Sequence, residues 1–216
     1  IDIATLKAEA STIPAGFSLY AIAITPDSTL ALVANFNGDF VSVIDIAGRQ
    51  TEAHAIGVGT SPTAIAVTPD GTLALVVNQN SYDVSVIDIA SRSAQPETIS
   101  VGDRPVAIAI TPDGTLALVA NSYSGDVSVI DIATLAAEPT AIQVGGSPTA
   151  IAITPDSTVA FVVNNASNDV TMIDIAGRSV VGQPIPVGQN PQDITITPNG
   201  EFVLTTNNGS KNVTVI

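Results

Sequence analysis

A short block of sequence recurs along the whole chain at a fixed interval. The turn Thr-Pro-Asp begins at Thr25, Thr68, Thr111 and Thr154, and Thr-Pro-Asn follows at Thr197, so each copy starts 43 residues after the previous one. The Asp of an Ile-Asp pair keeps the same interval, at Asp2, Asp45, Asp88, Asp131 and Asp174. A fixed period of about 20–50 residues is typical of solenoids, propellers and arrays. We therefore treat residues 1–216 as one domain built from five similar units.

Each unit is predicted to contain four β-strands and no helix. Inner strands are expected near 19–25, 62–68, 105–111, 148–154 and 191–197. Second strands follow near 29–34, 72–77, 115–120, 158–163 and 201–206, and third strands near 41–46, 84–89, 127–132, 170–175 and 212–216. Fourth strands are expected near 52–58, 96–101, 138–144 and 181–187, with residues 8–15 in the same slot of the repeat.

The residues between these strands are turn formers. In Thr-Pro-Asp-Gly the proline sets φ for the second turn position, and a Gly or Ser follows the Asp. An Asn closes every second strand, where its side chain can bond the backbone of the next turn. A Gly ends every fourth strand, at Gly16, Gly59, Gly102, Gly145 and Gly188. The chain is therefore predicted to be all-β.

The strands are apolar on both faces, which favours a β-propeller. Ile108 and Ile110 alternate with Ala107 and Ala109 rather than with polar residues. A sheet with one wet face would alternate apolar and polar side chains. Propeller blades are packed on both faces, and small alanines suit the narrow centre of the ring. A linear β-solenoid is the alternative, although its coils are usually shorter and it needs capping ends.

The register of the two termini predicts a closed ring of five four-stranded antiparallel blades. Ile1 and Ile216 occupy the same position of the repeat. Residues 212–216 are expected to pair with residues 8–15, so that a clasp between the N- and C-terminal strands completes the last blade and covers its edge. The alternative is that the chain is a five-repeat piece of a longer ring.

Composition excludes several classes of partner. Six Lys and Arg face 20 Asp and Glu, and the net charge of −14 makes nucleic acid and anionic membranes improbable partners. No apolar run reaches the roughly 18 residues of a membrane helix, and no signal peptide is expected. Cysteine is absent, which excludes disulfides and thiol chemistry.

The repeat resembles a known family. The sequence Ile-Ala-Ile-Thr-Pro-Asp-Gly, a strand ending in Asn, Val-Ser-Val-Ile-Asp and Val-Gly-x-x-Pro are similar to the YVTN-type β-propeller repeats of prokaryotic surface proteins, over essentially the whole chain. The box that names the family is degenerate here, for example Leu118-Val119-Ala120-Asn121. The resemblance implies an extracellular or cell-surface setting and a recognition or scaffolding role, and it carries over no catalytic residues. Members often form larger rings than five blades, and the similar copies also fit a consensus-based or excised version.

Candidate catalytic groups are few. His54 is the single histidine and lies in an outer strand, so neither a zinc site nor a Ser-His-Asp triad is expected. Asp27, Asp70, Asp113 and Asp156 occupy turns in which Asp is a normal turn former. No loop has the spaced acids of a calcium site. We expect no metal, no cofactor and no enzyme activity, although a pair of carboxylates acting on glycosides stays open.

Aromatic and polar departures from the repeat gather where the turns after the second strands meet the starts of the inner strands. We call this the upper end. The candidate ligand-binding residues there are Phe17, Tyr20, Phe36, Tyr82, Arg104, Tyr123, Gln192, Asp193 and Lys211. Exposed rings beside amides are typical of sugar or peptide recognition, although the same rings could simply cover the sheet ends. The opposite, lower end carries Arg49, Arg92 and Arg178 beside turn acids, and exposed charge pairs of little net stability are expected there.

Three functions follow from these patterns. The first is a non-enzymatic module that binds a glycan, a peptide or a partner protein through the upper end. The second is a propeller-type hydrolase or lactonase with its site at the axial mouth, where only Asp193 departs from the alanines found at that position in the other copies. The third is a purely structural subunit of a surface assembly.

Overall fold

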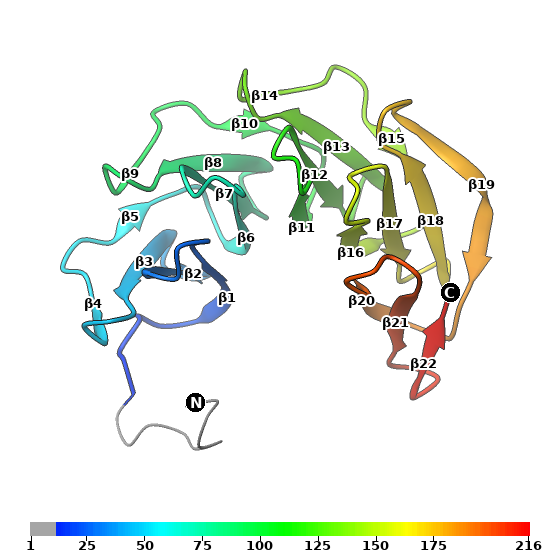
Figure 1. Ribbon diagram of the computed structural model, residues 1–216, viewed down its shortest axis with the longest axis horizontal. Helices are drawn as coiled ribbons and strands as arrows, with labels where there is room; N and C mark the ends of the chain where they lie inside the picture. The colour runs from blue at the N-terminus through cyan, green and yellow to red at the C-terminus, as the bar shows by residue number, and fades with distance from the viewer. Residues whose placement is uncertain (1–11) are drawn as a thin grey trace.

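The computed structural model describes residues 12–216, which form five antiparallel β-sheets arranged in an open arc (Figure 1). Every sheet has its first strand toward the centre of the arc, and its first three strands pair in sequence order. In the first three sheets two short outer strands both pair with the third strand. No helix able to span a membrane occurs within these residues. The predicted all-β architecture with one sheet per repeat is confirmed.

The strand bounds follow the 43-residue period. The first sheet contains β1 (Leu19–Ile24), β2 (Leu30–Asn35), β3 (Phe40–Asp45), β4 (Gln50–Thr51) and β5 (Ile56–Gly57). The second contains β6 (Pro62–Val67), β7 (Leu73–Asn78), β8 (Asp83–Asp88), β9 (Ser93–Ala94) and β10 (Ile99–Ser100). The third contains β11 (Pro105–Ile110), β12 (Leu116–Asn121), β13 (Asp126–Asp131), β14 (Ala136–Ala137) and β15 (Ile142–Gln143). The fourth contains β16 (Pro148–Ile153), β17 (Val159–Asn164), β18 (Asp169–Asp174) and β19 (Ser179–Pro186), and the fifth β20 (Pro191–Ile196), β21 (Val203–Asn207) and β22 (Asn212–Val215).

The fourth strands differ from the prediction. In the first three sheets the expected outer strand is reduced to two pieces of two residues each, whereas β19 runs on for 8 residues. Pro96 and Pro139 fall between the two pieces of the second and third sheets, where a residue without an N–H cannot continue the ladder. In β19, Gly182 adopts a φ of 71° beside a register shift, and this bulge lets the strand continue.

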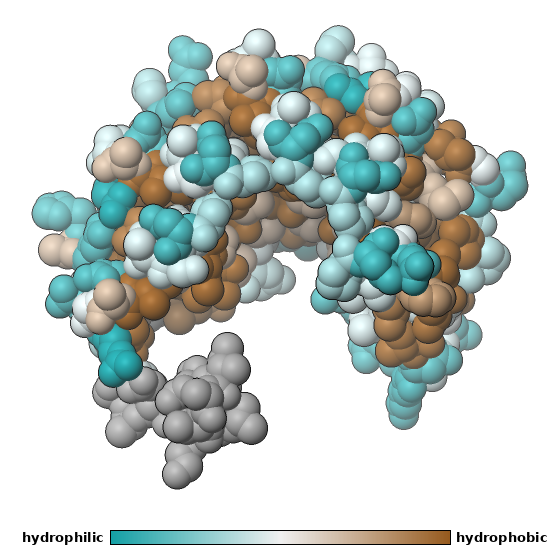
Figure 2. Space-filling view, viewed as in Figure 1, coloured by the Kyte–Doolittle hydropathy of each residue, from teal (hydrophilic) through white to brown (hydrophobic). Residues whose placement is uncertain are grey.

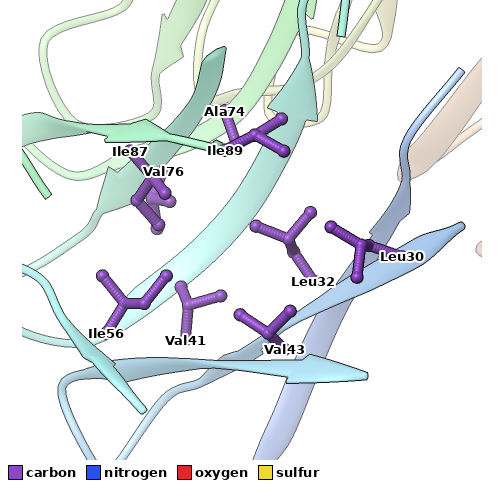
Figure 3. Close-up of a cluster of buried hydrophobic side chains, with 9 residues drawn as sticks. All are labelled: Leu30, Leu32, Val41, Val43, Ile56, Ala74, Val76, Ile87 and Ile89. Carbon is purple, nitrogen blue, oxygen red and sulfur yellow. The ribbon is translucent and has the colours of Figure 1, made fainter. Parts of the chain in front are cut away.

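The hydrophobic core consists of layers between neighbouring sheets. Each sheet presents a forward face to the next sheet along the chain and a rear face to the previous one. Between the first two sheets, Leu32 and Val43 of the forward face pack with Val76 and Ile87 of the rear face (Figure 3). Equivalent clusters fill the other three interfaces. Both faces of the middle three sheets are therefore buried, as the apolar alternation of the strands predicts.

The predicted ring closure is not confirmed. Figure 1 shows a gap between the first and fifth sheets, and the fifth sheet has three strands among the described residues. The predicted clasp falls partly on residues 8–11, which lie outside the described part of the chain. Ile13 and Ala15 pack on Ala31, Val33 and Ile44 of the first sheet, across the gap from β22. Within residues 12–216, β22 pairs only with β21.

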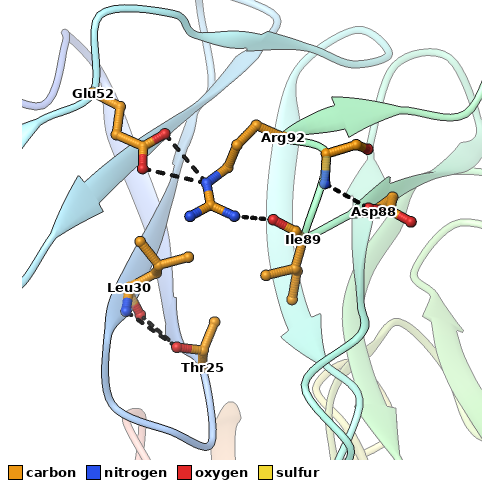
Figure 4. A network of polar contacts seen from close by, with 7 residues as sticks. Thr25, Leu30, Glu52, Asp88, Ile89 and Arg92 are labelled. Carbon is orange, nitrogen blue, oxygen red and sulfur yellow. Dashed lines mark hydrogen bonds and ion pairs between the residues drawn. The ribbon is translucent and has the colours of Figure 1, made fainter.

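The Thr-Pro-Asp turns at the lower end are stabilised from within. In each, the threonine hydroxyl donates to the aspartate and accepts the N–H of the residue that opens the second strand, as Leu30 does at 3.1 Å from Thr25 (Figure 4). In the third sheet, Asp113 accepts the Thr111 hydroxyl at 2.5 Å and the Thr115 backbone N–H at 3.0 Å. The interpretation of these aspartates as turn formers is confirmed.

These turns predict an acid-sensitive fold. Hydrogen bonds lower the pKa of Asp113: the bond from the Thr111 hydroxyl has the largest effect, and the bond from the Thr115 N–H the next largest. In the other turns, hydrogen bonds from the corresponding threonines lower the pKa of Asp27, Asp70 and Asp156. A carboxyl whose folded pKa lies below its unfolded value of about 3.9 contributes stability above that pH and loses it as pH falls through the folded pKa. The melting temperature should therefore fall as the pH drops below about 4. In Asp113→Asn, a smaller drop over the same pH range is expected, and an identical drop would contradict this origin.

Within residues 12–216, two ion pairs at the lower end connect neighbouring sheets. Arg92 of the second sheet lies 3.2 Å from Glu52 of the first and donates to the carbonyl of Ile89 (Figure 4). Arg178 and Glu138 repeat this contact at 2.7 Å between the fourth and third sheets. All four side chains are about one-third exposed, and such solvated pairs contribute about 0–1 kcal/mol each. The expected partners were the turn acids, whereas the partners found are glutamates that follow the short outer strands of the preceding sheet.

Candidate functional site

In all five sheets the turn after the second strand lies beside the start of the inner strand, so these segments share one end of the arc, as the sequence predicts. The turn after each second strand donates a backbone N–H to the residue just before the inner strand of its own sheet. These bonds are Phe36 to Ser18, Gln79 to Ser61, Ser122 to Arg104, Asn165 to Ser147 and Asn208 to Asn190, all 2.9–3.0 Å long. The candidate residues therefore share one end of the molecule, but they come from different sheets.

The structure divides the candidates into three groups. Phe17, Tyr20 and Phe36 belong to the first sheet, where the rings of Tyr20 and Phe36 stack at 5.4 Å and Phe17 meets Phe40 edge to face at 6.1 Å. Tyr82, Arg104 and Tyr123 lie on the second and third sheets and are exposed. Gln192, Asp193 and Lys211 belong to the fifth sheet, at the other end of the arc. A binding role for all three groups stays a prediction.

The fifth sheet carries two adjoining depressions in which several polar side chains lie. A depression of about 570 Å³ is lined by Gln192, Thr206, Asn208, Lys211 and Asn212, together with Asn207 and Val213. A second depression of about 200 Å³ adjoins it, since Thr206 and Val213 line both, and it adds Asp193 and Thr195 beside the apolar side chains of Ile194 and Leu204. We call the two together the polar hollow.

Strand pairing explains why these side chains share one face. Asp193 is opposite Thr206, and Thr206 is opposite Val213, so this row crosses β20, β21 and β22. Residues directly opposite each other in an antiparallel sheet point to the same side. The row lies on the forward face, which borders the gap. A register shift between Pro191 and Asp193 places Gln192 in a bulge, and the other four sheets have the same bulge at this position of the repeat.

The polar character of this sheet is a departure from the repeat. Asp193 and Thr195 stand where the first four sheets have alanine, and Thr206 stands where they have Ala34, Val77, Ala120 and Val163. Thr205, fully buried, replaces a valine of the other copies and donates to the carbonyl of Asp193 at 2.9 Å. Sequence reasoning identified Asp193 but missed Thr195 and Thr206, although aligning the five copies position by position reveals them.

The side chains around the hollow are held in different ways. Asp193 accepts the N–H of Ile194 at 2.9 Å, which holds one carboxylate oxygen in place. Lys211 adopts a left-handed φ of 57° at the tip of the turn. Asn207 is buried and donates to Asn212 and Thr214, so it anchors the wall of the hollow. Among residues 12–216, no three His, Cys, Asp or Glu side chains are grouped closely enough to hold a metal ion.

The comparisons with known proteins concern the fold first. Residues 131–216 match the model of the family described as "Lactonase, 7-bladed beta-propeller". A functionally unknown protein from Desulfotomaculum acetoxidans DSM 771 is similar in structure, with a TM-score of 0.79 and 19% identity over 93% of this chain and 69% of that one. Kuenenia stuttgartiensis hydrazine synthase is similar with a TM-score of 0.57 and 18% identity over 98% of both chains. No curated protein sequence matches the chain.

These findings correct one prediction and refine another. The expectation of no enzyme activity is contradicted, because the family matched over residues 131–216 is a family of lactonases, which are hydrolases. The predicted propeller is supported, but the YVTN type is not specifically supported. Since 1654 known chains share this arrangement and propellers host many activities, the fold alone does not identify the reaction. The comparisons place this chain among the β-propellers.

Proposed function

We propose that the chain is a propeller-type hydrolase that opens a lactone in the polar hollow. The observation that carries this proposal is that the hollow lies entirely within residues 131–216, the part matched by the lactonase family. The carboxylate of Asp193 lines one of the two adjoining depressions and the ammonium group of Lys211 lines the other, and general acid–base catalysis uses positioned carboxylates of this kind.

Asp193 has the role of general base. A water molecule attacks the carbonyl carbon of the lactone while the Asp193 carboxylate accepts a proton from that water. The carbon–oxygen bond of the ring then breaks, and the ring oxygen receives the proton as it leaves. Ring opening therefore consumes one water and yields one hydroxy acid, and no other reactant is needed.

Lys211 and the amides of Asn208 and Asn212 have the role of stabilising the negative charge that develops on the carbonyl oxygen. Preorganised donors aimed at such an oxygen typically contribute about 10²–10³-fold in rate. Gln192 and the Thr206 hydroxyl supply directional hydrogen bonds for a hydroxylated substrate. The hollow on the fifth sheet thus combines a base, a cation and neutral donors.

The test is hydrolysis of a six-membered aldonolactone, followed by acid release in a pH-stat. Asp193→Asn removes the base with little change in shape, and kcat should fall about 10²–10⁴-fold. Asp103→Asn is the matched control, because Asp103 is also an exposed carboxylate at the upper end but belongs to the third sheet. Its kcat should stay within twofold of the unmodified chain. Equal rates for Asp193→Asn and Asp103→Asn, or no hydrolysis by the unmodified chain, would reject the proposal.

A further inference from the structure

Neighbouring sheets are joined at the upper end by hydrogen bonds as well as by hydrophobic layers. Figure 2 shows hydrophobic side chains between the sheets along the arc, with polar residues at the turns. At the upper end, the turn after a second strand reaches the residue that precedes the inner strand of the next sheet. The Asp39 carboxylate accepts the backbone N–H of Ser61 at 2.8 Å, and the Asn168 amide oxygen accepts that of Asn190 at 2.7 Å. These contacts join the first sheet to the second and the fourth to the fifth.

The second and third sheets lack this contact, because both of its residues are replaced. Tyr82 takes the repeat position of Asp39, and Arg104 takes that of Ser61. Tyr82 has a φ of 58° and Asp39 a φ of 56°, so the two side chains leave the backbone in the same direction. A tyrosine ring places no carboxylate oxygen beside the N–H. Neither the backbone N–H nor the guanidinium of Arg104 donates to an acceptor within residues 12–216.

Tyr82 and Arg104 both stand at backbone positions that suit smaller residues. Each position has a positive φ in all five sheets, and the other sheets place mainly Gly, Asn, Asp or Ser there. Left-handed backbone is uncommon for large side chains and carries a cost in strain. Large side chains kept at strained positions indicate a functional role. The junction of the third and fourth sheets is the contrast, because Gly125 and Ser147 provide neither a ring nor a cation.

Two exposed tyrosine side chains belong to the turns that adjoin Arg104. The carbonyl of Tyr82 accepts the N–H of Val101 at 3.1 Å, which places this turn against the segment that leads to Arg104. The N–H of Tyr123 donates to the carbonyl of Asp103 at 3.1 Å. The side chains of Tyr82 and Tyr123 are 46% and 77% exposed. Tyrosine and arginine are the residues that most often dominate the energy of protein recognition.

We propose that Arg104 binds the carboxylate of an Asp or Glu side chain in a peptide segment of a partner protein. The backbone N–H of Arg104 takes that carboxylate as the N–H of Ser61 takes the carboxylate of Asp39. The guanidinium adds charge-assisted hydrogen bonds that a serine cannot make. An apolar or aromatic residue beside the acid lies on the rings of Tyr82 and Tyr123.

The first sheet supplies the pattern for this ligand. Asp39 presents its carboxylate from a peptide turn, and the aromatic Phe40 follows it directly. A peptide carboxylate with an aromatic neighbour therefore reproduces a contact that the chain already makes between two of its own sheets. The proposed peptide site lies on the second and third sheets, away from the polar hollow, and does not depend on the proposed hydrolysis.

The charge around Arg104 limits the affinity. The chain has a net charge of −14, and the carboxylate of Asp103 belongs to the neighbouring residue. Like charges oppose a bound anion, so the affinity should be modest. Asp103→Asn removes one of these charges and should strengthen binding about twofold.

The test uses a peptide with the sequence of residues 37–41, Asn-Gly-Asp-Phe-Val, acetylated and amidated at its ends. A matched peptide has Asn in place of Asp. Titration of the ¹⁵N-labelled chain should shift the Arg104 backbone amide signal, and the acidic peptide should bind about tenfold more tightly than the neutral one. Arg104→Gln should remove most of this difference while leaving the melting temperature unchanged.

Tyr82→Asp is the sharpest variant, because it restores the carboxylate that Asp39 supplies at the first junction. The new side chain should accept the Arg104 N–H, block the acidic peptide and keep or raise the melting temperature. The reciprocal triple variant Asp39→Tyr/Ser61→Arg/Asn80→Tyr moves the three residues to the junction of the first and second sheets. It should gain a second peptide site, seen as a shift of the amide at position 61.

Four results would overturn the proposal. They are equal affinity for the acidic and neutral peptides, no shift of the Arg104 amide, undiminished binding by Tyr82→Asp, and a folded triple variant without the second site. Methyl glucuronide is titrated in parallel. Binding of this sugar acid without binding of the acidic peptide would mean that the site takes a glycan, which also contradicts the proposal. Lactone hydrolysis by Tyr82→Asp should equal that of the unmodified chain, so the failure of either proposal is recognised separately.

Discussion

Replacing Gly102 by alanine is expected to destabilise the fold by about 2–3 kcal/mol, although the change adds one methyl group. A Cβ at Gly102 would lie 2.7 Å from the side-chain amide of Asn121 and 2.8 Å from the Ser124 hydroxyl. Asn121 cannot move away cheaply, because it is fully buried and donates to Asp126 at 2.6 Å and to Ser128 at 2.9 Å. For a chain of this length the melting temperature should fall by roughly 5–10 °C.

A double-mutant cycle identifies the cause. Asn121→Ala alone should cost about 1–3 kcal/mol, because it leaves buried partners without their donor. In the double variant Gly102→Ala/Asn121→Ala the methyl group meets no amide, so the two costs should not add. Chemical denaturation of the four proteins gives this coupling free energy. Additive losses would mean that Gly102 serves the backbone and not the packing of Asn121.

Replacing Val129 by aspartate should abolish folding, whereas Val215→Asp at the same repeat position should change stability by less than about 0.5 kcal/mol. Val129 is 1% exposed on the forward face of the third sheet and packs in the layer between the third and fourth sheets. A carboxylate there would be buried without a partner. Val215 is 60% exposed on the forward face of the fifth sheet, so its carboxylate would remain in water.

Comparing the stability of the Val129→Asp and Val215→Asp variants tests whether the forward face of the fifth sheet is exposed to solvent. Circular dichroism during thermal unfolding is sufficient, since one variant should be unfolded and the other close to the parent. An equally severe loss in Val215→Asp would show that the forward face of the fifth sheet is covered in solution.

The candidate site shows how a repeat can hide a function. Five near-identical copies make the consensus easy to see, and any one departure, such as Asp193, can be a neutral substitution. The paired strands change this assessment because Asp193, Thr206 and Val213 form one row, and Lys211 lies at the turn that closes it. Asp193, Thr195 and Thr206 are three polar departures on one face of one sheet, and sequence spacing alone did not bring them together.

The sequence by itself determined the first three strands of each sheet, their turns and the absence of helices within residues 12–216. The reason is local, because each feature depends on a few neighbouring residues: proline and aspartate at the Thr-Pro-Asp turn, and apolar alternation along six-residue strands. The buried faces of the middle sheets were also predictable, since both faces of a strand such as Leu116–Asn121 are apolar.

The tertiary structure decided three things that the repeat leaves open. The Gly that ends a fourth strand lies against a buried Asn, as Gly102 does against Asn121, and the sequence gives no sign that these two residues are in contact. The grouping of Asp193 with Thr195, Thr206 and Lys211 depends on strand register. The gap depends on the rotation between neighbouring sheets, which accumulates from side-chain volumes across four interfaces. The 43-residue period determines which strands each sheet contains. The number of sheets needed to close a ring depends instead on the angle at which two neighbouring sheets pack, and that angle is a property of the packed layers between them.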